Sequence, residues 1–334
     1  MDNLCHSLVG AALAKSGLEK RTALATATLV IGANLPDVDV LSYFWGADTA
    51  LGFRRGWTHG VLALAVWPFV LTGVMMVWDL LVRRRRRPRA EPARPRALLL
   101  LSTLAILTHP ALDWLNTYGM RWLMPFRDAW SYGDVLFIID PWIWLALGIG
   151  YLGSLARSRW GRDAAARPAR VALVLVAAYI AVLWGSRLAA AGVARESLTE
   201  RETAAGRLMA GPYPANPFRR QIVAVAGDRY VLATVDWLRR PRFQPGAPAF
   251  VARMDWRHRP VPRAFVPRNE DPRIRAAVAA TREGRIFLHW ARFPFYRVEP
   301  AGEGLLRIYV MDARYTINPG TGFGRMMVVV PAPP

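Results

Sequence analysis

One segment of this sequence combines an apolar helix with side chains that can bind metal. THPALDWLNTYG, residues 108–119, ends an apolar run and carries His109, Asp113 and Asn116, which are four and three residues apart. On an α-helix this spacing places the three side chains on one face. An imidazole and a carboxylate one turn apart can hold the same transition-metal ion, so this face predicts a metal-binding role for His109 and Asp113.

Residues of the same types recur where other apolar segments begin or end. NLPDVD carries Asp37 and Asp39, WTH carries His59, and a short apolar stretch near the start of the chain carries His6. Ionisable side chains inside a membrane are costly unless they face a polar interior, so each is a functional candidate. Histidines and aspartates together are the ligands of a zinc or similar divalent site, and one carboxylate could bridge two ions. The candidate metal ligands are His6, Asp37, Asp39, His59, His109 and Asp113.

Several neighbouring polar residues have a structural as well as a functional interpretation. Asn34 and Asn116 are candidates for hydrogen bonding to the ligands from behind. Asp140 either supports the same site or caps the helix that follows it. Arg54 and Arg55 either meet the charge of an anionic substrate or anchor the chain at the membrane interface.

The elements that must position these residues are membrane helices. The chain has 334 residues, 53 % of them hydrophobic, and its first half is too apolar for an ordinary soluble domain. Residues 4–14 form a short apolar segment that no positive charge precedes, which is not the pattern of a signal peptide. About 20 apolar residues cross a hydrocarbon core of roughly 30 Å. The runs of that length are 22–40, 58–82, 97–115, 135–156 and 171–191. We predict an α-helical polytopic membrane bundle of about five spans plus a short N-terminal helix.

Basic runs indicate how these spans are oriented. The formal net charge is +20, and the arginine-rich segments 83–96 and 157–170 flank predicted spans. Positive loops stay on the cytoplasmic side, so this distribution accounts for the charge without a nucleic-acid partner. Alternation then brings the histidines and most of the aspartates to the outer leaflet. His6 and His59 taken singly also fit an interfacial position, but a common depth for the whole set favours an outward-facing metal site.

The rest of the chain has a different pattern. Residues 1–191 form the predicted membrane domain, and 192–210 have the composition of a connecting helix. From 211 to 334 short β-branched and aromatic runs are cut by Gly and Pro, which predicts an antiparallel, β-rich extracytoplasmic domain. Gly227-Asp228 is a predicted hairpin turn, and the segments 284–300 and 304–317 are a predicted strand pair. The single cysteine excludes an intramolecular disulfide, and His258 and His289 lack metal-ligand spacing.

Four motifs, in order, resemble a known family. MDNLCHSLVGAAL, GANLPDVD, RRGWTHG and THPALDWLNTYG look like the membrane-bound metal-dependent hydrolases called YdjM-like, or LexA-binding inner-membrane hydrolases. The order of histidines and aspartates is also similar to that of zinc-dependent phospholipase C and the S1/P1 nucleases. This second resemblance implies that His109, His59, one of Asp37 or Asp39, and Asp113 hold one ion.

The same resemblance implies that Asp113 bridges to a second ion shared with His6. The sequence departs from those enzymes in two respects. Their amino terminus is a ligand, whereas here it lies five residues before His6, and the further His and Glu ligands of a third ion are missing. We therefore expect one or two divalent ions, Zn²⁺ by preference.

The predicted function is a membrane-bound metal-dependent hydrolase. A metal-activated water would cleave a phosphoester, of a small molecule or a lipid, at the outer face of the bacterial inner membrane. Whichever of Asp37 and Asp39 is not a ligand would be the general base, and Arg54 or Arg55 would bind substrate. The alternatives are an ion- or proton-handling transport protein and a membrane scaffold with a structural metal. The expected partners are the lipid bilayer and the substrate, and the sequence predicts no oligomeric state.

Overall fold

The computed structural model describes residues 1–158, 161–201, 206–252, 264–320 and 322–332. The chain forms two compact units, Met1–Phe44 with Phe53–Leu183, and Trp45–Gly52 with Trp184–Pro334. The division falls within the long helix α8 (Arg162–Thr199), which contributes residues to both units. Short α3 (Ala47–Phe53) lies at the other division.

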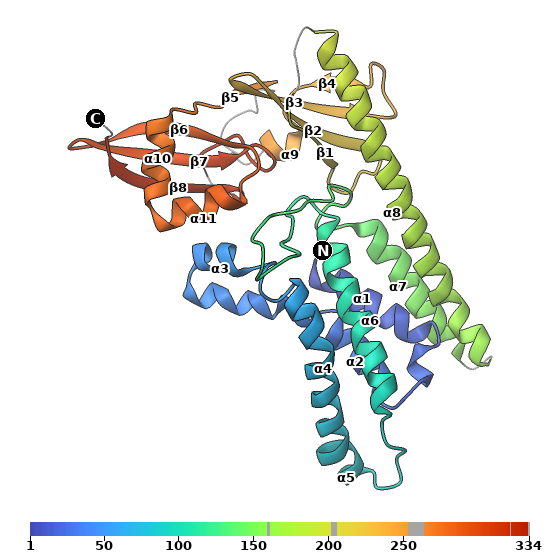
Figure 1. Ribbon diagram of the computed structural model, residues 1–334. Coiled ribbons are helices and arrows are strands. Elements are labelled where there is room, and N and C mark those ends of the chain that lie inside the picture. Colours follow the sequence, from blue (N-terminus) through green and yellow to red (C-terminus); the bar gives the residue numbers. More distant parts are fainter. Residues whose placement is uncertain (159–160, 202–205, 253–263, 321, 333–334) are drawn as a thin grey trace. The chain divides into compact units, whose positions relative to one another are not determined.

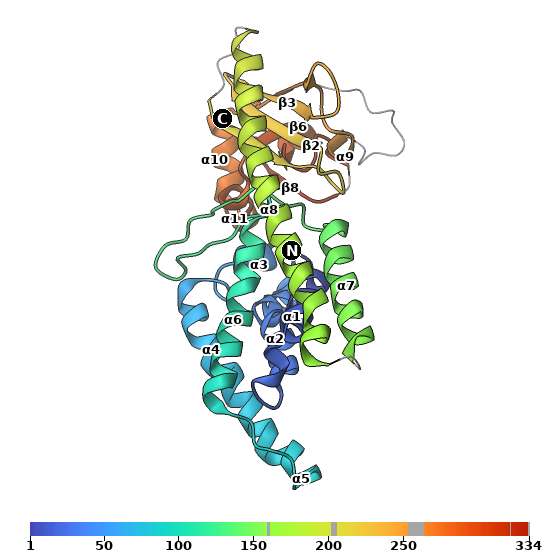
Figure 2. The same cartoon turned by 90° about the vertical axis from the view of Figure 1, so that its right-hand side faces the viewer.

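The first unit is helical. Two helices, α4 and α6, run side by side in both views (Figure 1, Figure 2). Its α-helices are α1 (Asn3–Lys15), α2 (Ala25–Gly32), α4 (Val61–Trp78), α5 (Arg84–Arg86), α6 (Pro95–Trp114), α7 (Pro141–Ala156) and the first part of α8. Its other helical segments are the 3₁₀ helices η1 (Leu18–Lys20) and η2 (Leu35–Trp45) and the π-helical turn η3 (Asp79–Arg83).

Among the described residues, three helices are long and apolar enough to cross a membrane. They are Val61–Arg86, Pro95–Trp114 and Ala164–Thr199, while the apolar helix α7 is shorter. The prediction of about five spans was therefore too high. The basic segment 157–170 was predicted as a loop, but its residues from Arg162 onward belong to α8.

Two predicted spans are interrupted for identifiable reasons. Segment 22–40 forms only the eight-residue α2 before the chain passes into η2, because Pro36 has no amide hydrogen to continue the α-helical ladder. Segment 135–156 becomes helical only at Pro141, where Asp140 caps α7 by accepting hydrogen bonds from the backbone of Trp142 and Ile143. Proline is favoured in the first turn of a helix, where its missing donor costs nothing.

Helix α6 is central in the packing of this unit. It packs against α2 and α4, and α1 packs against α2 and α7. Leu101 and Ala105 join a buried cluster with Leu29 of α2, and Ile106 joins another with Leu71 of α4. Gly10 permits the close approach of α1 and α2, because a Cβ there would lie 2.6 Å from the carbonyl oxygen of Leu29. This packing holds the ends of α1, α2, α4 and α6 together.

The second unit is the predicted β-rich region. All its strand pairings are antiparallel, in one sheet ordered β1-β2-β3-β4 with β5 beside β3, and another ordered β6-β7-β8. The strands are β1 (Leu208–Pro212), β2 (Arg219–Ala226), β3 (Arg229–Asp236), β4 (Phe243–Pro245), β5 (Phe265–Pro267), β6 (Pro294–Gly302), β7 (Leu305–Asp312) and β8 (Arg325–Pro331). The helices are α9 (Ala249–Ala252), α10 (Pro272–Ala280) and α11 (Arg282–Trp290).

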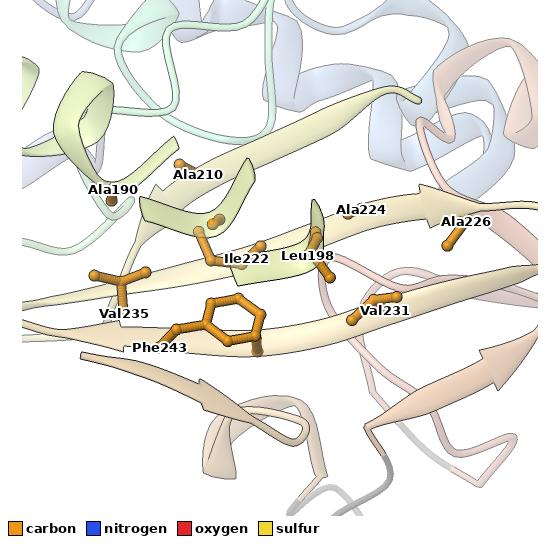
Figure 3. Packing of buried hydrophobic residues seen from close by; sticks show 11 residues of the cluster. Ala190, Leu198, Ala210, Ile222, Ala224, Ala226, Val231, Val235 and Phe243 are labelled. Atoms are coloured by element: carbon orange, nitrogen blue, oxygen red, sulfur yellow. The ribbon is translucent and has the colours of Figure 1, made fainter. Parts of the chain in front are cut away.

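The end of α8 forms part of this unit's core. Ala190 and Leu198 pack with Ile222, Val231 and Phe243 of the first sheet (Figure 3). The helix predicted over 192–210 is therefore the continuation of α8 and ends at Thr199, while residues 202–205 lie outside the described chain.

The strand predictions met with mixed outcomes. The turn at Gly227-Asp228 is confirmed, since Ala226 pairs with Arg229. Pairing of β6 with β7 is also confirmed, but residues 284–290 form α11 instead of strand. There the buried residues Gly284, Phe287 and Trp290 recur every three positions, which is a helical and not a strand period. His289 lies on the exposed side of α11, and His258 lies outside the described residues.

Candidate metal centre

Four side chains from three segments meet at one end of the helical unit. Asp37 comes from η2, His59 from the turn before α4, and His109 and Asp113 from the last turns of α6. Each residue offers one nitrogen or oxygen as a ligand atom, and these four atoms all lie within 4.8 Å of one another. All four residues are buried. This cluster could hold a metal ion, as the spacing of His109 and Asp113 predicts.

The distances within the cluster suit four-fold coordination. Nε2 of His59 lies 3.1 Å from Nε2 of His109, and both lie near Oδ2 of Asp113, at 3.4 and 3.5 Å respectively. Oδ1 of Asp37 lies 3.7 Å from His109 Nε2 and 3.9 Å from His59 Nε2. Ligands about 2.0–2.1 Å from a tetrahedral zinc lie about 3.4 Å from one another. The four atoms therefore surround a volume of the right size.

Both histidines are held with Nε2 facing the cluster. His109 Nδ1 lies 2.6 Å from the carbonyl oxygen of Ala33, to which only an N–H can donate. His59 Nδ1 lies 2.9 Å from Oγ of Thr58, whose own hydroxyl donates to Asp39. With Nδ1 as the donor, each neutral ring keeps the lone pair of Nε2 for the cluster, the arrangement found in metal-binding histidines.

The two aspartates of NLPDVD have different surroundings. Asp39 Oδ2 accepts hydrogen bonds from the backbone N–H of Arg55, at 2.9 Å, and from Thr58, at 3.2 Å. Its Oδ1 accepts from Nε of Arg54 at 3.0 Å. Asp39 thus holds the residues behind His59, whereas Asp37 joins the cluster itself. The sequence alone left the roles of these two residues open.

Asp113 has two further neighbours, one on α1 and one just before it. Its Oδ1 lies 3.2 Å from His6 Nε2, and the ring of His6 stacks on that of His109 with centroids 3.8 Å apart. The α-amino group of Met1 forms a buried ion pair with Asp113, a contact that sequence reasoning missed. Asp2 holds this first turn in place, because it caps α1 and accepts a hydrogen bond from the indole of Trp144. Asp2 at the N-cap position of α1 is the sequence feature that places the first turn, and with it Met1, beside the site.

The two arginines also contact the aspartates. Arg55 is buried, with Nε 3.2 Å from Asp113 Oδ2 and its guanidinium over the ring of Tyr118. Burial raises the pKa of Tyr118 to about 12. Arg54 is partly exposed and lies 3.5 Å from Asp37 Oδ1. Burial lowers the pKa of Arg54, but the neighbouring Asp39 carboxylate outweighs it and the net pKa is raised. A purely interfacial role does not fit Arg55.

The side-chain hydrogen bonds of Asn34, Asn116 and Asp140 join residues other than the cluster ligands. Asn34 donates to Oγ of Ser7, at 3.1 Å, and thereby links α1 to the end of α2. Asn116 accepts a hydrogen bond from the backbone N–H of Tyr118 at 2.8 Å. Asp140 makes the contacts of a helix cap and accepts a further bond from Tyr179. Of its two predicted roles, capping is the one these contacts describe.

Buried atoms without partners provide a test of the metal hypothesis. Among the described residues, Asp113 Oδ2 and His6 Nδ1 are buried and form no hydrogen bond. Leaving a buried polar atom unsatisfied is costly, and native structures rarely do so without a reason. Asp113 Oδ2 forms an ion pair with Arg55 but accepts no hydrogen bond, and a cation between His59, His109 and Asp113 would provide the missing partner. The donor set therefore fits a divalent ion.

Comparison with known proteins places this site in a family. The model of the YdjM inner membrane protein family matches residues 1–190, which include every member of the cluster. The chain belongs to the YdjM family. It is therefore a protein of the inner membrane family that the four motifs indicate.

Other comparisons add little to this assignment. A Bacillus subtilis (strain 168) protein named YfhP, described as uncharacterized, is 26 % identical over 135 residues. The match covers 39 % of this chain and only 38 % of YfhP. No solved structure matches the chain. The similarity to zinc-dependent phospholipase C and the S1/P1 nucleases gains no support from these comparisons.

Proposed function

We propose that this YdjM-family protein is a membrane-bound hydrolase that uses a divalent metal, Zn²⁺ by preference. The observation that carries the proposal is the convergence of two Nδ1-anchored histidines with two aspartates in one buried cluster. A divalent ion in such a site supplies Lewis acidity and makes water reactive near neutral pH. His59, His109, Asp113 and Asp37 would hold it.

The two aspartates of NLPDVD have different proposed roles beside the ion. Asp39 is a positioning residue, because both its oxygens are already engaged by Arg54, Arg55 and Thr58. Asp37 has the longest distances to the histidines and is the least buried aspartate of the site. It is therefore the proposed ligand nearest to solvent. Neither aspartate of NLPDVD is then free to act as the general base, because Asp37 would hold the ion and Asp39 is engaged by Arg54, Arg55 and Thr58.

The proposed substrate class is a phosphoester at the membrane surface, such as a lipid headgroup. Arg55 is committed to Asp113 and leaves little of its guanidinium for a substrate. Arg54 keeps 21 % of its side chain exposed and lies beside Asp37. Its guanidinium can contact a phosphate oxygen close to the cluster without a rearrangement of buried charge.

The polarity of the helices favours this function over ion or proton handling. A relay needs polar or ionisable groups along its path. The described segments Val61–Trp78 and 97–108 carry no ionisable side chain between the cluster and buried Asp79 at the far end of α4. These two segments therefore offer no chain of ionisable groups between their ends, which supports a surface-facing enzyme.

Metal analysis of detergent-purified protein tests the proposal. The wild type, His109→Ala and Asp113→Asn are compared with Asp140→Asn, which keeps a capping side chain outside the cluster. We expect bound metal in the wild type and Asp140→Asn only, with hydrolysis of phosphodiester or phospholipid substrates in the same two proteins. A folded wild type without metal would overturn the site. Stoichiometric metal without hydrolysis of any ester class would instead support a structural metal in a scaffold.

A further inference from the structure

A second feature of the helical unit lies at the opposite end of α6 from the metal cluster. A groove of about 830 Å³ opens there, within the size range of about 300–1,000 Å³ that accommodates ordinary ligands. His109 follows Arg96 by thirteen positions in α6, which is about 20 Å along a helix. The groove is therefore a separate site, and its function does not depend on the proposed hydrolase.

One end of this groove is strongly basic. Arg21, Arg94 and Arg96 line it, and all three are exposed. Within the described chain, none of these guanidinium groups pairs with a carboxylate: nearby Glu19 bonds to Lys15, and Asp79 pairs with Arg83. Three cations without a counter-charge predict an anionic ligand.

The backbone beneath these arginines is fixed on both sides. The N–H of Arg94 donates to Oγ1 of Thr22 at 2.7 Å, which joins the start of α6 to the segment that carries Arg21. The N–H of Ala93 donates to the buried carboxylate of Asp79 at 2.9 Å. These two hydrogen bonds fix the backbone at the start of α6 and join it to the segment that carries Arg21, so the ligand does not have to bring the two segments together.

The other end of the groove is apolar and faces outward. Leu100 and Leu104 are 72 % and 39 % exposed, and Leu101 lies between them. Together with Ala97 they recur at the spacing of one helix face and extend for about 10 Å along α6. Because Pro95–Trp114 is long and apolar enough to span a membrane, this face is where lipid chains lie.

The same combination occurs a second time. A groove of about 420 Å³ between α7 and α8 is lined by Arg157 and Arg167 at its basic end and by exposed Ile149, Val171 and Leu175. In both grooves arginines lie at the end of a helix and apolar side chains continue along it. An anionic head joined to an apolar chain is complementary to this arrangement.

We propose that the groove at the start of α6 binds an anionic phospholipid of the surrounding bilayer, phosphatidylglycerol in type. Its phosphate contacts Arg21, Arg94 and Arg96, and an acyl chain lies along Leu100 and Leu104. A zwitterionic lipid fits less well, because its ammonium group would face three guanidinium groups and the groove lining has no carboxylate to receive it.

Native mass spectrometry of the full chain tests this binding. Detergent-solubilised protein is titrated with 1-palmitoyl-2-oleoyl phosphatidylglycerol or the matching phosphatidylcholine. The groove variant replaces Arg21, Arg94 and Arg96 by Gln, and the matched control replaces Arg84, Arg85 and Arg86 of α5 by Gln, with the same loss of charge. We expect the tightest phosphatidylglycerol to bind at this groove, which has three arginines against two in the groove between α7 and α8. Its affinity should fall about tenfold or more in the groove variant and less than twofold in the control.

Two results would overturn the proposal. Equal losses in the two triple variants would mean that net charge alone attracts the lipid, and equal affinity of the wild type for the two lipids would mean that the groove does not select an anionic head. Leu104→Gln, which keeps all the arginines, provides a second variant and should weaken phosphatidylglycerol binding several-fold. Circular dichroism and metal content of each variant show whether the helical unit remains folded.

Discussion

Each of the two units contains a buried aspartate beside a buried arginine, and the two pairs differ in one respect. In the β-rich unit, Asp312 and Arg314 are fully buried, and both oxygens of Asp312 accept hydrogen bonds. The guanidinium of Arg314 lies about equally close to the rings of Trp290 and Tyr315, which stack on each other, and it also donates to the Trp290 carbonyl. Every polar group of the pair has a partner, as expected of a structural ion pair.

In the helical unit, Asp113 and Arg55 are also buried, but one oxygen of Asp113 accepts no hydrogen bond. Asp113 has an ammonium, an imidazole and a guanidinium nearby, yet its Oδ2 forms no hydrogen bond. That oxygen lies 3.2 Å from Nε of Arg55 and 3.4 and 3.5 Å from Nε2 of His59 and His109, so it faces two metal-ligand nitrogens as well as the guanidinium. Burial of charge therefore does not by itself mark a functional site. A buried carboxylate oxygen that accepts no hydrogen bond and faces metal-ligand nitrogens does.

The largest effect is expected from breaking the structural pair. Asp312→Ala leaves the Arg314 guanidinium buried without a carboxylate, which costs about 3–5 kcal/mol of stability. Glu299→Ala removes the partner of exposed Arg297 in the neighbouring strand and should cost about 0–1 kcal/mol. Thermal and denaturant unfolding, followed together with metal content, measures both. Equal destabilisation by the two substitutions, or loss of metal in Asp312→Ala, would contradict the distinction between the pairs.

Removing a cluster ligand should affect metal and leave the β-rich unit unchanged. His109→Gln deletes an imidazole whose Nε2 faces three other ligand atoms, so we expect metal affinity to fall about 100-fold or more. His289→Gln makes the same substitution on the exposed side of α11 and should leave the affinity unchanged. Competition with a chelator of known affinity gives both values. Retention of wild-type affinity by His109→Gln would remove His109 from the ligand set.

A smaller effect is expected from the residue behind the ligands. Asp39→Asn keeps the ligand atoms but replaces the acceptor that holds Thr58, and through it His59. Loss of such an outer contact costs about 10–100-fold in metal affinity. The number of ions bound at saturation should not change, which separates positioning from ligation. A lower stoichiometry in Asp39→Asn would show that this carboxylate coordinates the ion itself.

The site was more predictable from the sequence than the fold around it. Asp113 follows His109 by one helical turn, and that local spacing fixes a shared face whatever the rest of the chain does. Which aspartate of NLPDVD joins the cluster was not predictable, because residues two apart in a 3₁₀ segment can point to different partners. The roles of Asp37 and Asp39 are distinguished only by the hydrogen bonds that Asp39 accepts from Arg54 and Arg55.

The errors in the fold share a physical cause. Hydropathy reports that a segment is apolar, but not that Pro36 ends one helix or that Asp140 starts another late. Likewise the mixed composition of residues 284–290 looked like strand, although its buried positions recur every three residues. Capping and backbone donors, which composition does not capture, determine where elements begin and end.

The smallest predicted effect returns to the β-rich unit and concerns pH. Burial raises the pKa of Tyr230 to about 12, above its ordinary value of 10.0. The folded state therefore favours the neutral phenol, so its contribution to stability is complete below about pH 10 and is lost as pH rises toward 12. Its hydroxyl donates to the carbonyl of Pro294 at 2.8 Å, and Tyr230→Phe should cost about 0.5–1.5 kcal/mol near neutral pH.

Unfolding of the wild type and Tyr230→Phe, measured at intervals from pH 8 to 12, tests this linkage. The wild type should lose more stability than Tyr230→Phe over the interval from 10 to 12, so the difference between them should narrow there. Parallel curves would show that ionisation of this phenol is not coupled to folding. The metal cluster should not contribute to the difference, because the substitution leaves every ligand and its orienting partner in place.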